Sequence, residues 1–359
     1  MNNKKILPIE TNEITPEMKA SLKTRVITAI VMTVILVPCI FIGSWAYAIA
    51  GAILGAFAAY ELVHVSKPSK RFRIPIYIMT IMLVESYIFW IFIKNNVVYL
   101  ISEHEFTNIW SIFDTNFTNI EISIIALVST AAVYFVFSFL DDDTTIFMVV
   151  YYIAMSVIIG VCFQSFMYLR YSPFTAFGAN QELTSSNIFK YLQSSFLLIY
   201  VLLGVFMNDI GAYFTGILFG KHRVNPRISP KKTWEGIVGG IVFSMALSLT
   251  FALVMSAVGY PIFPVLDLDH WYYVLILSLT MPMIGDIGDF VFSAIKRYFG
   301  VKDFSNLLPG HGGVLDRFDS LIFGAALVSC FLVMITGGWT FGIRDFPGAQ
   351  IVNALINIF

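Results

Sequence analysis

Runs of about twenty mostly apolar residues recur along this chain, and they restrict its fold more than any other feature. A helix that crosses a membrane needs about 20 such residues. Nine stretches of this kind lie at roughly 26–43, 45–63, 74–93, 122–140, 146–169, 195–218, 237–257, 271–292 and 321–340. Only 13% of the 359 residues are charged, about half the share in a soluble domain. The sequence therefore predicts an all-α, polytopic integral membrane protein with about nine transmembrane helices.

Lysine and arginine are concentrated in four segments, which share one side of the membrane if the helices number nine. These segments are the N-terminal tail and the loops around 67–73, 221–232 and 296–317. Because loops rich in Lys and Arg stay in the cytoplasm, the N-terminus is expected inside the cell and the C-terminus outside. The loop 140–145 falls on the basic side although it carries three aspartates, since acidic residues contribute little to this rule.

Four parts can be distinguished along the chain, although no internal repeat or linker separates a second folded domain. Residues 1–25 form a polar cytoplasmic tail, and 26–194 form the N-terminal membrane helices. Residues 195–340 form a membrane region that carries the polar motifs, and 341–359 form a C-terminal tail. The chemistry is therefore expected in 195–340, at the cytoplasmic ends of its helices.

The first polar motif is Asn208-Asp209 inside the predicted helix 195–218. A carboxylate within a membrane helix is costly and by default marks a functional site. Gly211 and Gly216 on the same helix permit close approach of a neighbouring helix. The alternative is a structural polar contact in the bundle, and the depth and adjacency of the two polar residues favour a site.

The second motif reads RISPKKTWEG over 227–236. We expect it to open the next helix, with Ser229 as the N-cap and Pro230 in the first turn, positions that suit these residue types. The N–H groups of a helix N-terminus bind anions, and lysines such as Lys231 and Lys232 bind phosphate as point charges. A basic anchor at the lipid headgroups is the alternative, but the interleaved hydroxyl and acidic groups, Thr233 among them, favour a site.

The third motif supplies carboxylates from two elements. Asp286 and Asp289 are three residues apart, so they share one helix face, and Asp316 and Asp319 repeat the spacing after a glycine-rich turn. Oxygen ligands without cysteine suit a hard cation such as Mg²⁺.

Glycine and basic residues surround these carboxylates. Gly310, Gly312 and Gly313, which flank His311, permit left-handed backbone and close approach of amides to a ligand. The basic residues are Lys296, Arg297, Lys302 and Arg317. Metal-binding carboxylates among so many cations imply a polyphosphate ligand. Three other polar residues in apolar runs, Glu61, His64 and Glu85, are interpreted as satisfied contacts between helices.

Residues 293–320 resemble a known family signature. The pattern Ser-x-x-Lys-Arg-x4-Lys-Asp over 293–303, followed by PGHGG-x-x-DR-x-DS over 309–320, resembles the signature of phosphatidate cytidylyltransferases, also called CDP-diacylglycerol synthases. SPKKTWEG at 229–236 and D-x-x-AY-x-x-G at 209–216 are similar to other motifs of that family, in the same order. The resemblance is specific over about 205–325. One position departs from the pattern: Phe292 stands where the family usually has an acid, three positions after Asp289. Asp286, one turn before Asp289, is a candidate replacement.

The resemblance implies the transfer of the cytidylyl group of CTP to phosphatidate, giving CDP-diacylglycerol and pyrophosphate. It implies a metal site at Asp289 and Asp316, with two cations, Mg²⁺ and a second that can be monovalent. The supporting acids are then Asp209, Asp286 and Asp319. The expected phosphate-binding residues are Ser229, Lys231, Lys232 and Thr233. The expected charge-neutralising residues are Lys296, Arg297, Lys302 and Arg317. His311, Gly312 and Gly313 would shape the nucleotide loop.

The partners that this interpretation implies are CTP and a phosphatidate in the bilayer, with no nucleic acid, and the family suggests a homodimer. The protein is expected in the cell membrane with its site facing the cytoplasm, where CTP is. Two alternatives stay open at this point. One is another CTP-dependent lipid enzyme such as a polyprenol kinase, which would release CDP. The other is a transporter of an anionic metabolite, which would need neither CTP nor Mg²⁺.

Overall fold

A computed structural model describes residues 16–103, 119–176 and 192–336. Helices account for nearly all regular structure in these residues, and the only described strands form one short hairpin. The helices are α1 (Pro16–Ile42), α2 (Ser44–Ser66), α3 (Arg73–Glu103), α5 (Asn119–Leu140), α6 (Ile146–Ala176), α8 (Phe196–Phe219), α9 (Trp234–Ala257), α10 (Trp271–Tyr298) and α11 (Leu315–Thr336). The strands are β1 (Arg223–Asn225) and β2 (Ser229–Thr233).

Each apolar run that predicted a membrane span overlaps one of these helices, and for the run 321–340 this holds up to Thr336, where the described residues end. Seven of the helices in the described residues are long and apolar enough to cross a membrane, and Ala126–Leu140 within α5 is a shorter apolar helix. This confirms an all-α polytopic membrane protein, whereas the count of nine spans stays a prediction. Only Gly43 separates α1 from α2. Of the predicted polar tail 1–25, residues 16–25 belong to helix α1, while residues 1–15 and the predicted tail 341–359 lie outside the described residues.

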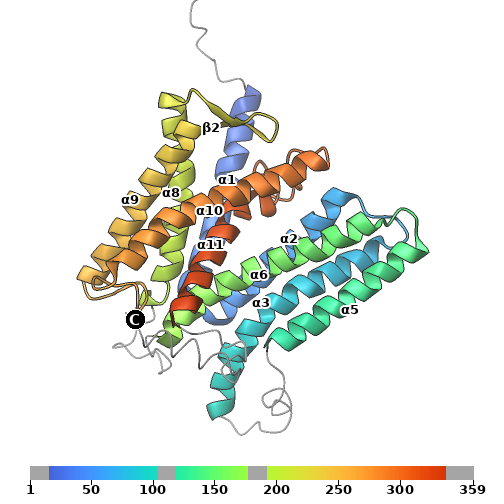
Figure 1. Ribbon diagram of the computed structural model, residues 1–359, viewed down its shortest axis with the longest axis horizontal. Coiled ribbons are helices and arrows are strands. Elements are labelled where there is room, and N and C mark those ends of the chain that lie inside the picture. The colour runs from blue at the N-terminus through green and yellow to red at the C-terminus, as the bar shows by residue number, and fades with distance from the viewer. Residues whose placement is uncertain (1–15, 104–118, 177–191, 337–359) are drawn as a thin grey trace, which may run out of the picture.

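The helices form two groups that share α11 (Figure 1). In one group α8 packs along α9, and both contact α10. In the other group α3 packs against α2, α5 and α6. α11 contacts α10 and α8 on one side and α6 on the other. α11 therefore links the two groups of helices. The glycine-rich motif at 309–314, which directly precedes α11, lies between these groups.

The contact between α8 and α9 depends on small residues, as the sequence predicted for Gly211. A Cβ added at Gly211 would lie 3.1 Å from the Cα of Gly240 on α9 and 2.8 Å from the Cβ of Phe243. Any larger side chain would push the two helices apart. This close approach holds Asn208, one turn earlier on α8, against its neighbours.

The loops that carry the polar motifs gather at one end of the bundle, which we call the motif end. Arg297 at the end of α10 donates from Nε to the Ile228 carbonyl of the β-hairpin at 3.4 Å. Thr28 of α1 donates to the Pro309 carbonyl at 2.9 Å. The turn 141–145 also lies here, as expected, since it lines a cavity together with 67–73 and 301–307. The grouping of basic loops on one side of the membrane is therefore consistent with the structure.

The start of α9 differs from the expectation that Ser229 caps the helix and Pro230 occupies its first turn. Residues 229–233 are instead strand β2, which pairs antiparallel with β1. The helix begins at Trp234, and its N-cap is Thr233, whose hydroxyl accepts the Gly236 N–H at 3.1 Å. Pairing with β1 keeps the Ser-Pro-Lys-Lys segment extended, so its lysines project from a strand.

Candidate active site

Two carboxylates of α10 share one lysine from the β-hairpin. The Lys232 ammonium lies 2.8 Å from Oδ1 of Asp286 and 2.7 Å from Oδ2 of Asp289. Asn208 of α8 donates from Nδ2 to the other oxygen of Asp286 at 3.2 Å. Three separate elements therefore meet at these carboxylates, and Asp286 is almost completely buried.

The charge of Lys232 is secured by its neighbours. Burial alone would lower the pKa of the ammonium, but the carboxylates of Asp289 and Asp286 outweigh burial and raise the pKa above its usual value. A lysine with a raised pKa contributes its stabilisation at every pH below the usual value of about 10.4 and loses it only as the pH rises further. The ammonium is therefore a fixed positive charge throughout the neutral range.

A second lysine, Lys296 on α10, holds the carboxylates of α11. Its Nζ lies 2.7 Å from Oδ1 of Asp316 and 3.9 Å from Oδ2 of Asp319. The other oxygen of Asp316 accepts the Phe304 N–H at 2.8 Å and the Gly313 N–H at 2.9 Å. The loop between α10 and α11, residues 299–314, thus wraps around Asp316 and fixes it in place. We call it the motif loop. We call Asp286, Asp289, Asp316, Asp319, Lys232 and Lys296 the carboxylate–lysine cluster.

The glycine-rich turn adopts the backbone that the sequence predicted. Gly310 and Gly312 have φ values of 76° and 82°, a region that non-glycine residues rarely occupy. A Cβ on Gly312 would also lie 3.0 Å from Oδ2 of Asp316. Arg317 donates from Nε to the His311 carbonyl at 2.9 Å. The His311 Nδ1 is buried and has no hydrogen-bond partner among the described residues, so it is available to a ligand.

Glu61 of α2 is the residue that sequence reasoning missed as part of this site. Its carboxylate accepts the Val314 and Leu315 N–H groups, each at 2.8 Å, and the Ser305 hydroxyl at 2.6 Å. It is completely buried and caps the N-terminus of α11. The expectation that Glu61 is a satisfied contact between helices is confirmed, but the contact also anchors both sides of the motif loop. Its only sequence signal is an acid near the end of an apolar run.

For Glu85 the same expectation is wrong, since both of its carboxylate oxygens are buried without a hydrogen-bond partner among the described residues. His64 is exposed and its ring Nδ1 lies 3.4 Å from the Tyr77 hydroxyl.

We expect Glu61→Ala to weaken the motif loop more than it weakens the bundle. The change removes the acceptor of two buried N–H groups, and an unsatisfied buried donor costs about 1–3 kcal/mol. Limited proteolysis of the protein in detergent should cut within 301–314 at least tenfold faster in the variant. Glu85→Ala is a matched control, because it removes a buried glutamate that contacts no loop donor. Equal cleavage rates in both variants would contradict the anchoring role of Glu61.

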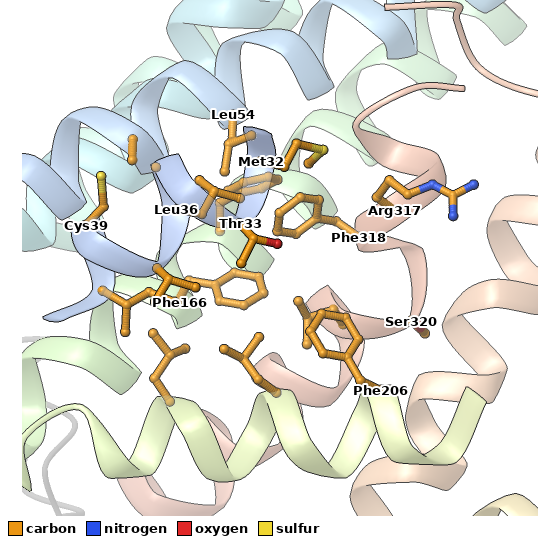
Figure 2. Close-up of a pocket in the computed structure, with 18 of the residues that line it drawn as sticks. Met32, Thr33, Leu36, Cys39, Leu54, Phe166, Phe206, Arg317, Phe318 and Ser320 are labelled. Carbon is orange, nitrogen blue, oxygen red and sulfur yellow. The ribbon is translucent and has the colours of Figure 1, made fainter. Parts of the chain in front are cut away.

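An apolar cavity of about 560 Å³ adjoins the cluster (Figure 2). Figure 2 shows Met32, Leu36 and Cys39 of α1 on one side and Phe166 and Phe206 of α6 and α8 on the other. Its polar lining consists mainly of Asp209, His311, Asp316, Arg317, Asp319 and Ser320. The cavity is therefore amphiphilic, with a hydrocarbon-like body and a charged wall.

The remaining predicted residues lie around this centre or farther away. Asp209 has an exposed side chain that lines the apolar cavity. Lys231 is exposed on β2, two residues before the buried cap Thr233. Arg297 is exposed and donates to the carbonyls of Ile228 and Val301. Lys302 lines a different cavity, on the far side of the motif loop, so the structure does not bring it to the cluster.

The donor set suits a hard cation in its chemistry. Five carboxylates, counting Asp209, surround two lysines, and they offer only oxygen ligands, which Mg²⁺ prefers. As they stand, no three His, Cys, Asp or Glu side chains of the described residues are placed to hold a metal ion. In the cluster the ammonium groups of Lys232 and Lys296 fill the gaps between carboxylates. The excess of negative charge still fits added cations.

Phe292, which stands where an acid was expected, has no polar role. It is completely buried and packs edge-on against Phe304 and Phe323, with ring centroids 5.8 and 6.1 Å away. An acid there would face the aromatic core, whereas Asp286 shares Lys232 with Asp289. The position of Asp286 supports the interpretation that it replaces the missing carboxylate.

These features define a class: a polytopic α-helical membrane protein in which a carboxylate–lysine cluster adjoins an amphiphilic cavity. Residues 23–335 match the model of the cytidylyltransferase family. The phosphatidate cytidylyltransferase of Bacillus subtilis is 30% identical over 303 residues, which cover 84% of this chain and 94% of that protein. The chain therefore belongs to the cytidylyltransferase family.

Staphylococcal relatives match a shorter segment. The phosphatidate cytidylyltransferase of Staphylococcus saprophyticus is 41% identical over 138 residues, covering 38% of this chain and 49% of that protein. That of Staphylococcus aureus strain COL is 39% identical over 136 residues, covering 38% of this chain and 48% of that protein. The chain thus aligns with about half the length of each staphylococcal relative.

Proposed function

We propose that this protein transfers the cytidylyl group of CTP to phosphatidate, giving CDP-diacylglycerol and pyrophosphate. Family membership and the name of the Bacillus relative support this reaction. The observation that carries the proposal is the apolar cavity whose charged wall includes residues of the carboxylate–lysine cluster. A substrate with acyl chains and a phosphate matches both parts: the chains lie among α1, α6 and α8, and the phosphate lies near Arg317 and His311.

The chemistry joins two anions. An oxygen of the phosphatidate phosphate attacks the α-phosphorus of CTP, and the bond from that phosphorus to the oxygen bridging to the β-phosphate breaks. The electron pair leaves on pyrophosphate. The attacking phosphate is already ionised at neutral pH, so no strong general base is needed. Positive groups fixed beside the reacting oxygens lower the barrier, and Lys232, Lys296 and Arg317 are the cations best placed to do so.

Divalent cations belong to this proposal as well. Asp289 and Asp316, supported by Asp209, Asp286 and Asp319, are the residues that would hold Mg²⁺. The metal would polarise phosphoryl oxygens and stabilise the leaving pyrophosphate. The contacts with Lys232 and Lys296 hold the carboxylates of Asp289 and Asp316 in place for this role.

Orientation and assembly complete the proposal. We place the motif end in the cytoplasm, because basic loops stay on that side and because CTP is there. The homodimer that the family suggests is part of the same proposal, and no nucleic acid takes part.

Chelation should abolish turnover. We expect EDTA to reduce the formation of CDP-diacylglycerol by at least about a hundredfold, the scale of one lost electrostatic stabiliser, and added Mg²⁺ to restore it. The measurement is product formation by purified protein in mixed micelles. Turnover that persists in EDTA would contradict a metal-dependent reaction.

The leaving group tests the function against its alternatives. Purified protein with CTP, phosphatidate and Mg²⁺ should release one pyrophosphate for each CDP-lipid formed. Release of CDP would instead identify a lipid kinase. Flux of an anion into liposomes without any dependence on CTP would identify a transporter.

A further inference from the structure

A second cavity, of about 1490 Å³, opens at the motif end on the other side of the motif loop. Three segments line it: the end of α2 with the start of α3, the turn after α5, and residues 301–307. Its cationic lining residues are Lys67, Lys70, Arg71, Arg73 and Lys302. Its acidic lining residues are Asp141, Asp143 and Asp303. We call this the basic cavity, and none of the functions proposed above uses it.

Some of these charged side chains already have partners within the protein. Arg71 donates from NH1 to the Leu140 carbonyl at 2.7 Å. Hydrogen bonds from Ser69 and Thr144 lower the pKa of Asp141 and keep it ionised beside Arg71. In contrast, no ion pair of the described residues involves Lys67, Lys70 or Lys302. The charged side chains of the cavity that take part in no ion pair therefore carry a net positive charge.

The backbone adds to the positive potential. α3 begins at Arg73, which lines the cavity, and a helix N-terminus carries partial positive charge. Lys67 has φ 53°, the only positive φ of a non-glycine residue in the described part of the chain. This left-handed residue ends α2 and turns the chain into the cavity wall. Strained backbone of this kind is concentrated at ligand sites.

The surroundings of the cavity favour a ligand that lies in the membrane. Ile74, next to Arg73, is 70% exposed, and Phe139, just before the turn, is 88% exposed. Phe147 at the start of α6 is also exposed. Tyr60 and Tyr77 stack with ring centroids 5.1 Å apart at the wall, and tyrosines are typical of the headgroup region. Apolar side chains would contact acyl chains just below the cations.

We propose that the basic cavity binds the phosphate of an anionic phospholipid at the membrane surface, apart from the carboxylate–lysine cluster. The diester phosphate would contact Lys67, Lys70 and Lys302, and the acyl chains would lie along Ile74, Phe139 and Phe147. The same loop forms the other wall of the active site, because Phe304 and Ser305 bond to Asp316 and Glu61. A lipid seated here would therefore brace the loop that fixes Asp316.

Native mass spectrometry of the detergent-solubilised protein can test this, with dioctanoyl phosphatidylglycerol as the probe and dioctanoyl phosphatidylcholine as the neutral comparison. The test variant is Lys67→Asn with Lys70→Gln, since asparagine tolerates the left-handed backbone at 67. The control is Lys221→Gln with Arg227→Gln, which removes two exposed charges from the β-hairpin region. Lys70→Glu alone, at an exposed loop position, keeps the test usable if the double variant does not fold.

Phosphatidylglycerol should bind the wild type at least tenfold more tightly than phosphatidylcholine. The test variant should lose about thirtyfold in affinity for phosphatidylglycerol, from the contribution of each basic residue near an anionic lipid, and the control should stay within twofold. Equal losses in both variants would show diffuse attraction and overturn the site. Full competition by glycerol phosphate or CTP at the same concentration would overturn the assignment to a lipid. These outcomes do not depend on turnover, so they stand apart from the proposed reaction.

Discussion

Asp316→Asn will reduce the formation of CDP-diacylglycerol by at least about a hundredfold, as expected when one fixed electrostatic group is lost from a site of this kind. The carboxylate of Asp316 contacts Lys296 through one oxygen and two backbone N–H groups through the other. The asparagine amide has only one acceptor oxygen, so it can replace only one of the two carboxylate oxygens. Its NH2 group would then face either the backbone N–H donors or the Lys296 ammonium. Asp316→Asn therefore removes the negative charge and disturbs the motif loop at the same time.

The measurement for Asp316 is initial rate with CTP and phosphatidate, accompanied by thermal unfolding in the same detergent. Asp142→Asn is the matched control, because Asp142 lies exposed in the turn after α5. The control should keep the wild-type rate. A rate for Asp316→Asn within threefold of the wild type would show that the carboxylate has no part in turnover.

Lys232→Met will both inactivate and destabilise the protein. The variant leaves Asp286 and Asp289 without the ammonium that lies within 2.8 Å of both. Breaking a largely buried ion pair from one side costs about 3–5 kcal/mol, so thermal unfolding should shift down clearly. For stability, Lys231→Met is the matched control, since its side chain is exposed on the same strand and should leave the midpoint almost unchanged.

A double-variant cycle separates the lost pair from lost packing. Adding Asp286→Asn to Lys232→Met removes one of the stranded charges, so stability should recover by a kcal/mol or more, within the range of about 0.5–3 kcal/mol for coupled neighbours. Additive losses in the double variant would mean that Lys232 and Asp286 do not interact in the folded protein.

The fold was predictable where local pattern decides it. Apolar runs such as 146–169 and 271–292 lie within α6 and α10 because a membrane span must satisfy its backbone internally. The start of α9 was predicted wrongly, since Ser229-Pro230 also reads as a cap and first turn. Pairing of β2 with β1 keeps this segment extended instead. Such a short strand pair has no recognisable pattern in the sequence of either strand alone.

The site was predictable as a set of residues but not as a set of contacts. Polar groups such as Asp209 and Asp286 stood out because apolar helices rarely tolerate them. Which groups pair was not predictable, because Lys232 meets Asp286 across 54 residues and Glu61 meets Leu315 across 254. Such long-range pairs come from helix packing, which spacing along the chain does not encode. Lys302 illustrates the reverse case, since its place in the motif suggested the cluster and the structure places it in the basic cavity.

The most direct test of the central proposal follows the α-phosphate of CTP. Purified wild-type protein with Mg²⁺, phosphatidate and CTP labelled at the α-phosphorus should move the label into lipid, and label at the γ-phosphorus should appear only in pyrophosphate. Asp289→Asn and Asp316→Asn should transfer almost none. Label from the γ-position in the lipid, or undiminished transfer by either variant, would contradict cytidylyl transfer at this site.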